Sequence, residues 1–63
     1  MIVYVTLKSE MTTRIYEGVS EWDFVERGNK WFLYLRDNDK TTRGRYTECF
    51  IIIDDIIRIS IER

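Results

Sequence analysis

The carboxylates and the single thiol of this chain are the first candidates for chemistry. Glu48, Asp54 and Asp55 are close in the sequence, and paired carboxylates can serve as general acid and general base. Cys49 would need a neighbouring base to act as a nucleophile. The chain has no histidine, so a base working near neutral pH would have to be a carboxylate or lysine with a strongly shifted pKa. Carboxylates at strand ends and a cysteine in an apolar run have simpler structural roles, and we predict no enzymatic activity and no catalytic residue.

A second pattern is Asp37-x-Asp39-x-Thr41. Its spacing is that of an aspartate nucleophile in phosphoryl transfer, but that motif follows a buried parallel strand in a much larger α/β domain. Calcium loops require glycine at the sixth position and glutamate at the twelfth; here Thr42 and Glu48 occupy these positions, so only the second requirement is met. Aspartate and asparagine are also ordinary turn residues. We therefore predict no metal site and no cofactor.

Basic side chains gather in the same polar stretch. Together with the tyrosine that follows them they form a candidate nucleic-acid patch, which consists of Lys40, Arg43, Arg45 and Tyr46. Small barrels bind single strands through basic loops and stacking aromatic rings. Asp37, Asp39 and Glu48 reduce the local positive field, and a net charge of −1 provides no long-range attraction to a polyanion. Nucleic-acid binding is the alternative function, and salt-dependent binding of a fluorescent oligonucleotide would support it.

Length and composition limit the fold that can hold these residues. The chain has 63 residues, of which 44% are hydrophobic and 33% charged, which predicts one small globular domain over residues 1–63. Domains of this size often rely on disulfides, metal ions or self-association for stability. Cys49 is the only cysteine, so self-association is the expected route. No apolar stretch approaches the length of a membrane span and no secretory signal is evident, so we expect a cytoplasmic protein without membrane contact.

Short alternating segments predict an all-β fold. Strands are expected over residues 2–8, 13–19, 31–35, 45–53 and 56–62, and residues 20–26 either continue the second strand or form a short helical turn. Ile57, Ile59 and Ile61 are expected to face inward. Val3, Val5 and Leu7 are expected to share one face of their strand, and Ile15 to share a face with Val19. Gly18 predicts a bend and residues 27–30 a turn. Five strands with short loops predict an antiparallel meander curled into a small barrel.

Two of these segments are apolar on both faces. A strand over a single core normally alternates apolar with polar residues, as residues 57–62 do, but residues 31–35 and 49–53 do not. Side chains from residues 20–26 could cover the second face; otherwise a partner must cover it. The candidate oligomer or partner interface comprises Phe32, Tyr34, Cys49, Ile51 and Ile53, and the pattern does not say which face points into the core. On this basis, charges introduced at Tyr34 and Ile51 should dissociate an oligomer.

Three stretches carry a family resemblance. VTLKS at residues 5–9, YEGVSEW at 16–22 and FIIIDDIIRI at 50–59 resemble small uncharacterised β-barrel proteins of Gram-positive phages and prophages. The last stretch is also similar to the end of Sm-like barrels, where a strand, a tight turn and a final strand build the contact between ring subunits. The resemblance implies a ring- or dimer-forming barrel of the Sm-like or Src-homology-like type. The N-terminal helix and RNA-contact signature of Sm-like proteins are missing, so RNA binding is not transferred.

The residues and the resemblance favour the same class of function. We predict a non-enzymatic protein-binding or assembly module that acts as a homo-oligomer. Its first expected partner is itself, and the resemblance adds a phage or host protein and an accessory role in a phage or prophage.

Overall fold

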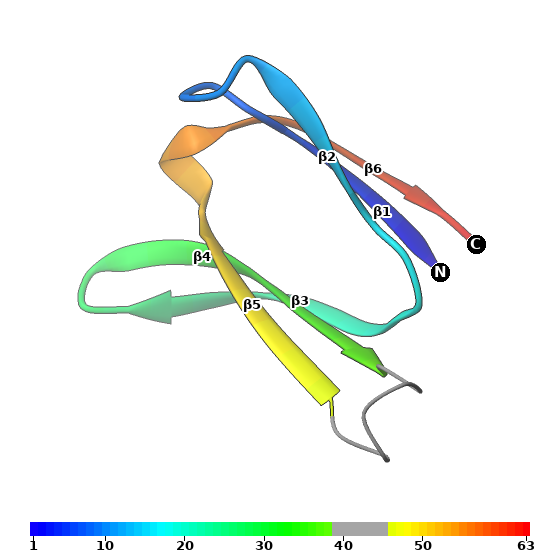
Figure 1. Ribbon diagram of the computed structural model, residues 1–63. Coiled ribbons are helices and arrows are strands. Elements are labelled where there is room, and N and C mark those ends of the chain that lie inside the picture. Colours follow the sequence, from blue (N-terminus) through cyan, green and yellow to red (C-terminus); the bar gives the residue numbers. More distant parts are fainter. Residues whose placement is uncertain (39–45) are drawn as a thin grey trace.

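The fold consists of two small antiparallel sheets that face each other. The computed structural model describes residues 1–38 and 46–63, without the side chains of Asn38 and Tyr46. The elements are β1 (Ile2–Leu7), β2 (Thr12–Tyr16), β3 (Val19–Arg27), β4 (Lys30–Asn38), β5 (Tyr46–Ile52), the short 3₁₀ turn η2 (Ile53–Asp55) and β6 (Ile56–Glu62). One sheet has the order β2-β1-β6 and the other β3-β4-β5 (Figure 1). The all-β prediction is confirmed, but the described strands number six instead of five and pair within two sheets instead of around one closed barrel.

The sixth strand arises where the chain crosses between the sheets at Gly18. The glycine has a φ of +67°, a left-handed conformation that costs glycine less than any other residue. Val19 and Met1 exchange two hydrogen bonds there: the Val19 N–H donates to the Met1 carbonyl at 3.0 Å, and the Met1 ammonium donates to the Val19 carbonyl at 3.1 Å. Residues 20–26 belong to β3, so this segment is strand and not a helical turn. The chain bends at Gly18 as predicted, but the sheet does not continue through the bend, which separates two strands that the sequence pattern had joined.

The second crossing, through η2, is held by Asp55. The Lys8 N–H donates to the Asp55 backbone carbonyl at 2.7 Å. The Ser9 N–H and hydroxyl both donate to the Asp55 carboxylate, at 2.8 and 2.6 Å. These bonds fasten the β1–β2 turn to the segment between β5 and β6, so Asp55 has a structural role in the fold.

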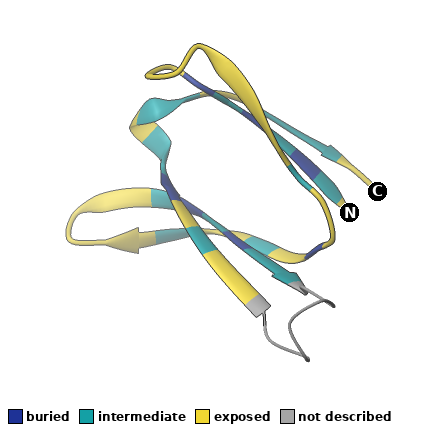
Figure 2. Cartoon of the chain, viewed as in Figure 1, coloured by how far each residue is buried: buried dark blue, intermediate teal, exposed yellow. Residues whose placement is uncertain are grey.

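The core fills the space between the sheets (Figure 2). Its buried members are Val3, Val5, Leu7, Val19, Leu33, Leu35 and Ile51, and the half-buried side chains packed around them are Tyr16, Trp22, Cys49, Ile53, Ile56, Ile59 and Ile61. The shared face predicted for Val3, Val5 and Leu7 is confirmed, and it points into the core. The inward orientation predicted for Ile59 and Ile61 is also confirmed. Apolar residues from every described strand therefore contribute to one core.

Two isoleucines do not lie on the faces predicted for them, because strand pairing and strand boundaries differ from the simple alternation along the sequence. Ile57 is 54% exposed, since a bulge at the end of the β1–β6 ladder places Ile56 opposite Leu7. Ile15 is 58% exposed and lies opposite Tyr4 on the outer face of its sheet. The chain then leaves this sheet at Gly18, so Ile15 does not share a face with the buried Val19.

The β3–β4 hairpin is the longest paired unit. Gly28 and Asn29 form its tight turn with φ values of +59° and +64°, the pattern of the type I′ turns that suit twisted hairpins. The turn predicted at residues 27–30 is thus confirmed. Each hairpin strand has nine residues, whereas β1 has six, and the tip projects beyond the facing sheet (Figure 1). Phe24 and Trp31 remain 46% and 52% exposed there, although they lie on the inner face.

Candidate protein-binding surface

The structure divides the predicted interface residues between two faces. Phe32 and Tyr34 lie on the outer face of β4, whereas Cys49, Ile51 and Ile53 face the core. Ile51 is only 9% exposed, and the other two pack against the buried cluster. The prediction that these five residues share one face is therefore wrong. The physical reason is register: a strand alternates faces at every residue, and the segment 49–53 pairs with β4 in the register that turns its odd-numbered residues inward.

Phe50 and Ile52 occupy the outer positions instead. Phe50 lies opposite Tyr34, with 5.2 Å between the ring centroids, and Ile52 lies opposite Phe32. On the other side of β4, Val25 of β3 lies opposite Phe32. We call Val25, Phe32, Tyr34, Phe50 and Ile52 the apolar band. Phe50 is 41% exposed and the other four are half-buried, so the band forms part of the solvent-facing surface.

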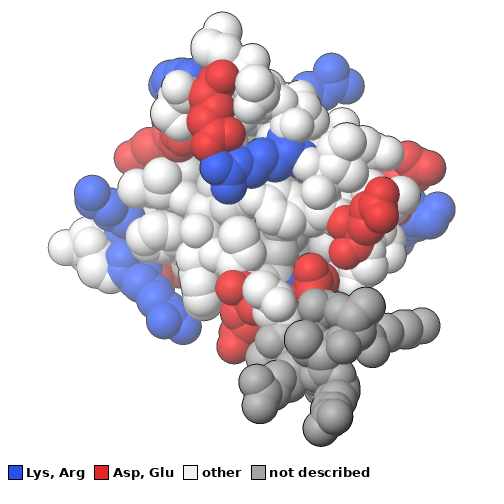
Figure 3. Space-filling model, viewed as in Figure 1, with Lys and Arg blue, Asp and Glu red and all other residues white. Residues whose placement is uncertain are grey.

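Charged groups of opposite sign flank the apolar band. We call Glu21, Asp23 and Glu48 its acidic end, and Arg27 and Lys30, beside the hairpin turn, its basic end. Arg36 lies between Glu21 and Glu48 in the register, with its Nη1 atom 3.8 Å from Glu21 Oε2. On the side of the molecule shown in Figure 3, acidic and basic side chains form small separate groups and no broad patch of one sign.

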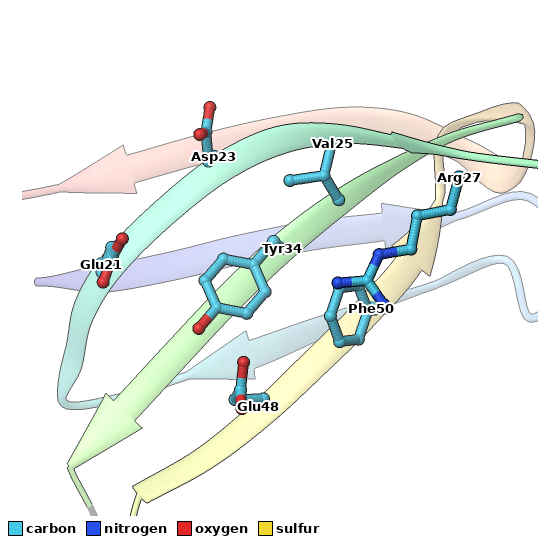
Figure 4. Close-up of a pocket in the computed structure, with 7 residues that line it drawn as sticks. All are labelled: Glu21, Asp23, Val25, Arg27, Tyr34, Glu48 and Phe50. Atoms are coloured by element: carbon cyan, nitrogen blue, oxygen red, sulfur yellow. The ribbon is translucent and has the colours of Figure 1, made fainter.

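A shallow hollow of about 260 Å³ connects the acidic end to the band (Figure 4). Its lining residues are Glu21, Asp23, Val25, Arg27, Tyr34, Glu48 and Phe50. The Arg27 guanidinium carbon lies 4.8 Å from the centre of the Phe50 ring, a cation–π contact that covers part of this ring. Tyr34 points its hydroxyl toward Glu48, and a hydrogen bond with that carboxylate raises the pKa of Tyr34 above its usual value. The hollow thus offers carboxylates and aromatic faces, which together suit a cationic group.

Tyrosine ionisation should require a higher pH in the folded protein than in the unfolded chain. Hydrogen bonds to Glu62 and Glu48 raise the pKa of Tyr4 and Tyr34, and burial raises the pKa of Tyr16. Because the folded state holds these protons more tightly, their contribution to the free energy of unfolding is complete below the usual pKa of about 10 and is lost as pH rises through the raised values. Ultraviolet titration of tyrosinate in native buffer and in urea measures this difference.

The matched variant for this titration is Tyr34→Phe. It should remove one of the groups that ionise late and leave the late ionisation of Tyr4 and Tyr16 in place. Native and unfolded titration curves that coincide would contradict the raised pKa values.

The residues considered for catalysis are not brought together. Glu48 lies on the outer face, whereas Asp54 and Asp55 lie in η2 beyond the other end of β5. The Cys49 thiol donates a long hydrogen bond of 4.0 Å to the Tyr16 hydroxyl at the margin of the core. This arrangement gives Cys49 and Asp55 structural roles in the fold.

The candidate nucleic-acid patch lies largely outside the described residues. This holds for Lys40, Arg43, Arg45 and the side chain of Tyr46, and also for Asp39 and Thr41 of the aspartate pattern. Nucleic-acid binding therefore stays a prediction. Within residues 1–38 and 46–63, no group of three or more Cys, Asp or Glu side chains is placed to hold a metal ion. No helix in the same ranges has the length and apolar character needed to cross a membrane.

Comparisons of this chain with protein-family models, curated proteins and solved structures find no match. Sequence reasoning missed Val25, Arg27, Phe50 and Ile52 as surface residues. The sequence does contain the information that places Val25 and Arg27. A two-residue turn at Gly28 and Asn29 fixes the hairpin register, which sets Val25 opposite Phe32 and Arg27 opposite Lys30. No comparable local signal places Phe50 and Ile52, because the register of β5 depends on long-range pairing.

Proposed function

We propose that this protein is a non-enzymatic protein-binding module that self-associates through the outer face of the β3-β4-β5 sheet. The apolar band carries the proposal. Its aromatic and aliphatic side chains lie side by side on a sheet face that no other described strand covers. Burying such a surface against a second copy removes apolar area from water, which adds stability that a single core of this size hardly supplies.

The composition of this face supports an interface between proteins. Phenylalanine, tyrosine and arginine are enriched at interface centres, and Phe32, Tyr34, Phe50 and Arg27 lie together here. Charged groups border the band at both ends, as in an interface with an apolar centre and a polar rim. These features favour a protein partner of similar character, and a second copy of the chain has that character.

The finer parts of the prediction rest on the resemblance or, for the cellular location, on the sequence pattern alone. A relation to Sm-like or Src-homology-like barrels, an accessory role in a phage or prophage and a cytoplasmic location remain predictions. Each concerns the biological setting, whereas self-association can be tested with the purified protein.

Replacing Phe50 with aspartate should weaken self-association strongly without unfolding the chain. The wild-type protein should form a dimer or larger oligomer at micromolar concentration, and F50D should raise the dissociation constant at least about tenfold, because association would bury an unpaired charge. Sedimentation velocity or light scattering over a concentration series measures both states. Circular dichroism checks that the variant remains folded.

Trp31→Asp is the matched control. Trp31 is another exposed aromatic residue of the same hairpin, 52% exposed, but it lies on the opposite face of the sheet. W31D should leave the dissociation constant nearly unchanged. A wild-type protein that stays monomeric at high micromolar concentration would contradict self-association, and dissociation by W31D instead of F50D would move the interface to the inner face of the hairpin tip.

A further inference from the structure

We infer that two copies meet face to face about a two-fold axis that places the basic end of each copy over the acidic end of the other. The inference rests on the proposed function, because it requires the outer face of β3-β4-β5 to be the surface of self-association. It adds the orientation of the partner and assigns the acidic hollow as the site that receives the partner's cationic side chains.

Strand pairing arranges the outer face in rows across the three strands. The first row is Glu21, Arg36 and Glu48, the second Asp23, Tyr34 and Phe50, the third Val25, Phe32 and Ile52, and the fourth Arg27 and Lys30. The first two rows hold three carboxylates and one guanidinium, a net charge of −2, and the fourth row holds two cations, a net charge of +2. The third row is entirely apolar. The charge of this face therefore changes from negative at one end of the strands to positive at the other.

This order makes the face complementary to itself in one orientation. A two-fold axis parallel to the sheet and running across the strands exchanges the first row with the fourth and the second with the third. Arg27 of each copy then lies over Glu21 of the other, and Lys30 lies over Arg36, which Glu21 and Glu48 flank. The fourth row, with a net charge of +2, therefore faces a first row with a net charge of −1, once on each side of the axis. Tyr34 and Phe50 meet Phe32 and Ile52 of the second copy, so the apolar bands cover each other.

The other face-to-face orientation brings like charges together. An axis running along the strands would leave each row opposite its own copy, with the basic ends adjacent and the acidic ends adjacent. Such juxtaposition disfavours an arrangement even where the apolar contact is equally good. The charges thus select the orientation, while the apolar band supplies the driving force.

Arg27 also affects how much of Phe50 is available for this contact. In the single chain its guanidinium lies over Phe50, 4.8 Å from the ring centre, and both residues line the hollow with the three carboxylates. The contact shows that an arginine side chain is accommodated on this face. When Arg27 turns to the carboxylates of the second copy, the Phe50 ring becomes available for burial. Tyr34, which shares a hydrogen bond with Glu48, lines the same hollow as that carboxylate.

A charge exchange between two variants tests the orientation. The acidic variant carries Arg27→Glu with Lys30→Glu, and the basic variant carries Glu21→Lys with Glu48→Lys. Each alone should self-associate more weakly than wild type by about tenfold or more, because the facing ends now carry like charges. An equimolar mixture should recover association as a mixed dimer, in which both sets of facing charges are again opposite. Native mass spectrometry identifies the mixed species, and sedimentation velocity gives its dissociation constant.

The outcomes separate this inference from the proposed function. A monomeric wild type contradicts both. A wild-type dimer with variants that associate normally, or that do not recover on mixing, overturns the orientation and leaves self-association standing. If either variant fails to fold by circular dichroism, the salt dependence of wild-type association decides: the dissociation constant should rise between about 0.05 M and about 0.5 M salt, and a fall would indicate facing like charges.

Discussion

Replacing Leu33 with alanine should lower the free energy of unfolding by about 2–5 kcal/mol, the range observed when a buried leucine is truncated and leaves a cavity. Leu33 is 0% exposed and lies in β4, the central strand of its sheet. Domains below about 70 to 80 residues rarely have more than about 3–5 kcal/mol of stability from a single core, so L33A should be largely unfolded without denaturant. Urea denaturation followed by tryptophan fluorescence measures the change.

Ile57→Ala is the control for this experiment. The two residues are apolar and of similar size, but Ile57, which the sequence pattern predicts to face inward, is 54% exposed. Its truncation should change the free energy of unfolding by no more than about 0.5 kcal/mol. Equal losses at the two positions would contradict the bulge that turns Ile57 outward.

Replacing Ile51 with aspartate should unfold the chain, in contrast to the same change at its neighbour Phe50. Ile51 is 9% exposed and lies opposite Leu33 inside the core, so aspartate there would be a buried charge without a partner. Such a charge costs several kcal/mol, which exceeds what a domain of this size can lose. The sequence-based expectation that a charge at Ile51 dissociates an oligomer of folded chains therefore does not apply to this residue.

Circular dichroism and size measurement distinguish the two variants. I51D should lose the β signal and expand, whereas F50D should keep its fold and lose association. Ile51→Val serves as the control, because it retains an apolar side chain in the same place and should cost only about 0.5–1.5 kcal/mol. A folded, monomeric I51D protein would show that residue 51 lies at an interface and not in the core.

Local chemistry accounts for the parts of the fold that could be predicted. Alternation in β1 groups Val3, Val5 and Leu7 on one face, and glycine and asparagine at residues 28 and 29 identify the hairpin turn. Gly18 marks the place where the chain bends. Each of these features depends on residues that are neighbours in the sequence. Neighbouring residues do not reveal that the chain crosses into a second sheet at this bend. The predicted number of strands was therefore one too low.

Long-range contacts account for the parts that could not be predicted. The bulge that exposes Ile57 depends on the pairing of β6 with β1, and the role of Asp55 depends on hydrogen bonds to Ser9, which is 46 residues away in the sequence. Asp54 and Asp55 suggest a carboxylate pair only when read in isolation. In the structure, the Asp55 carboxylate accepts a hydrogen bond from Ser9 in the β1–β2 turn, whereas Glu48 lies in β5 opposite Arg36.

The sequence by itself determined that two strands carry more apolar surface than one small core requires, because side-chain type and alternation are written in the chain. Tertiary structure alone decided which residues of β5 face outward. An uninterrupted apolar run such as residues 49–53 is compatible with either register, and a shift of one residue exchanges the two faces. Pairing of Leu33 with Ile51 makes that choice, and it places Phe50 and Ile52, between an acidic and a basic end, on the surface where we expect a second copy to bind.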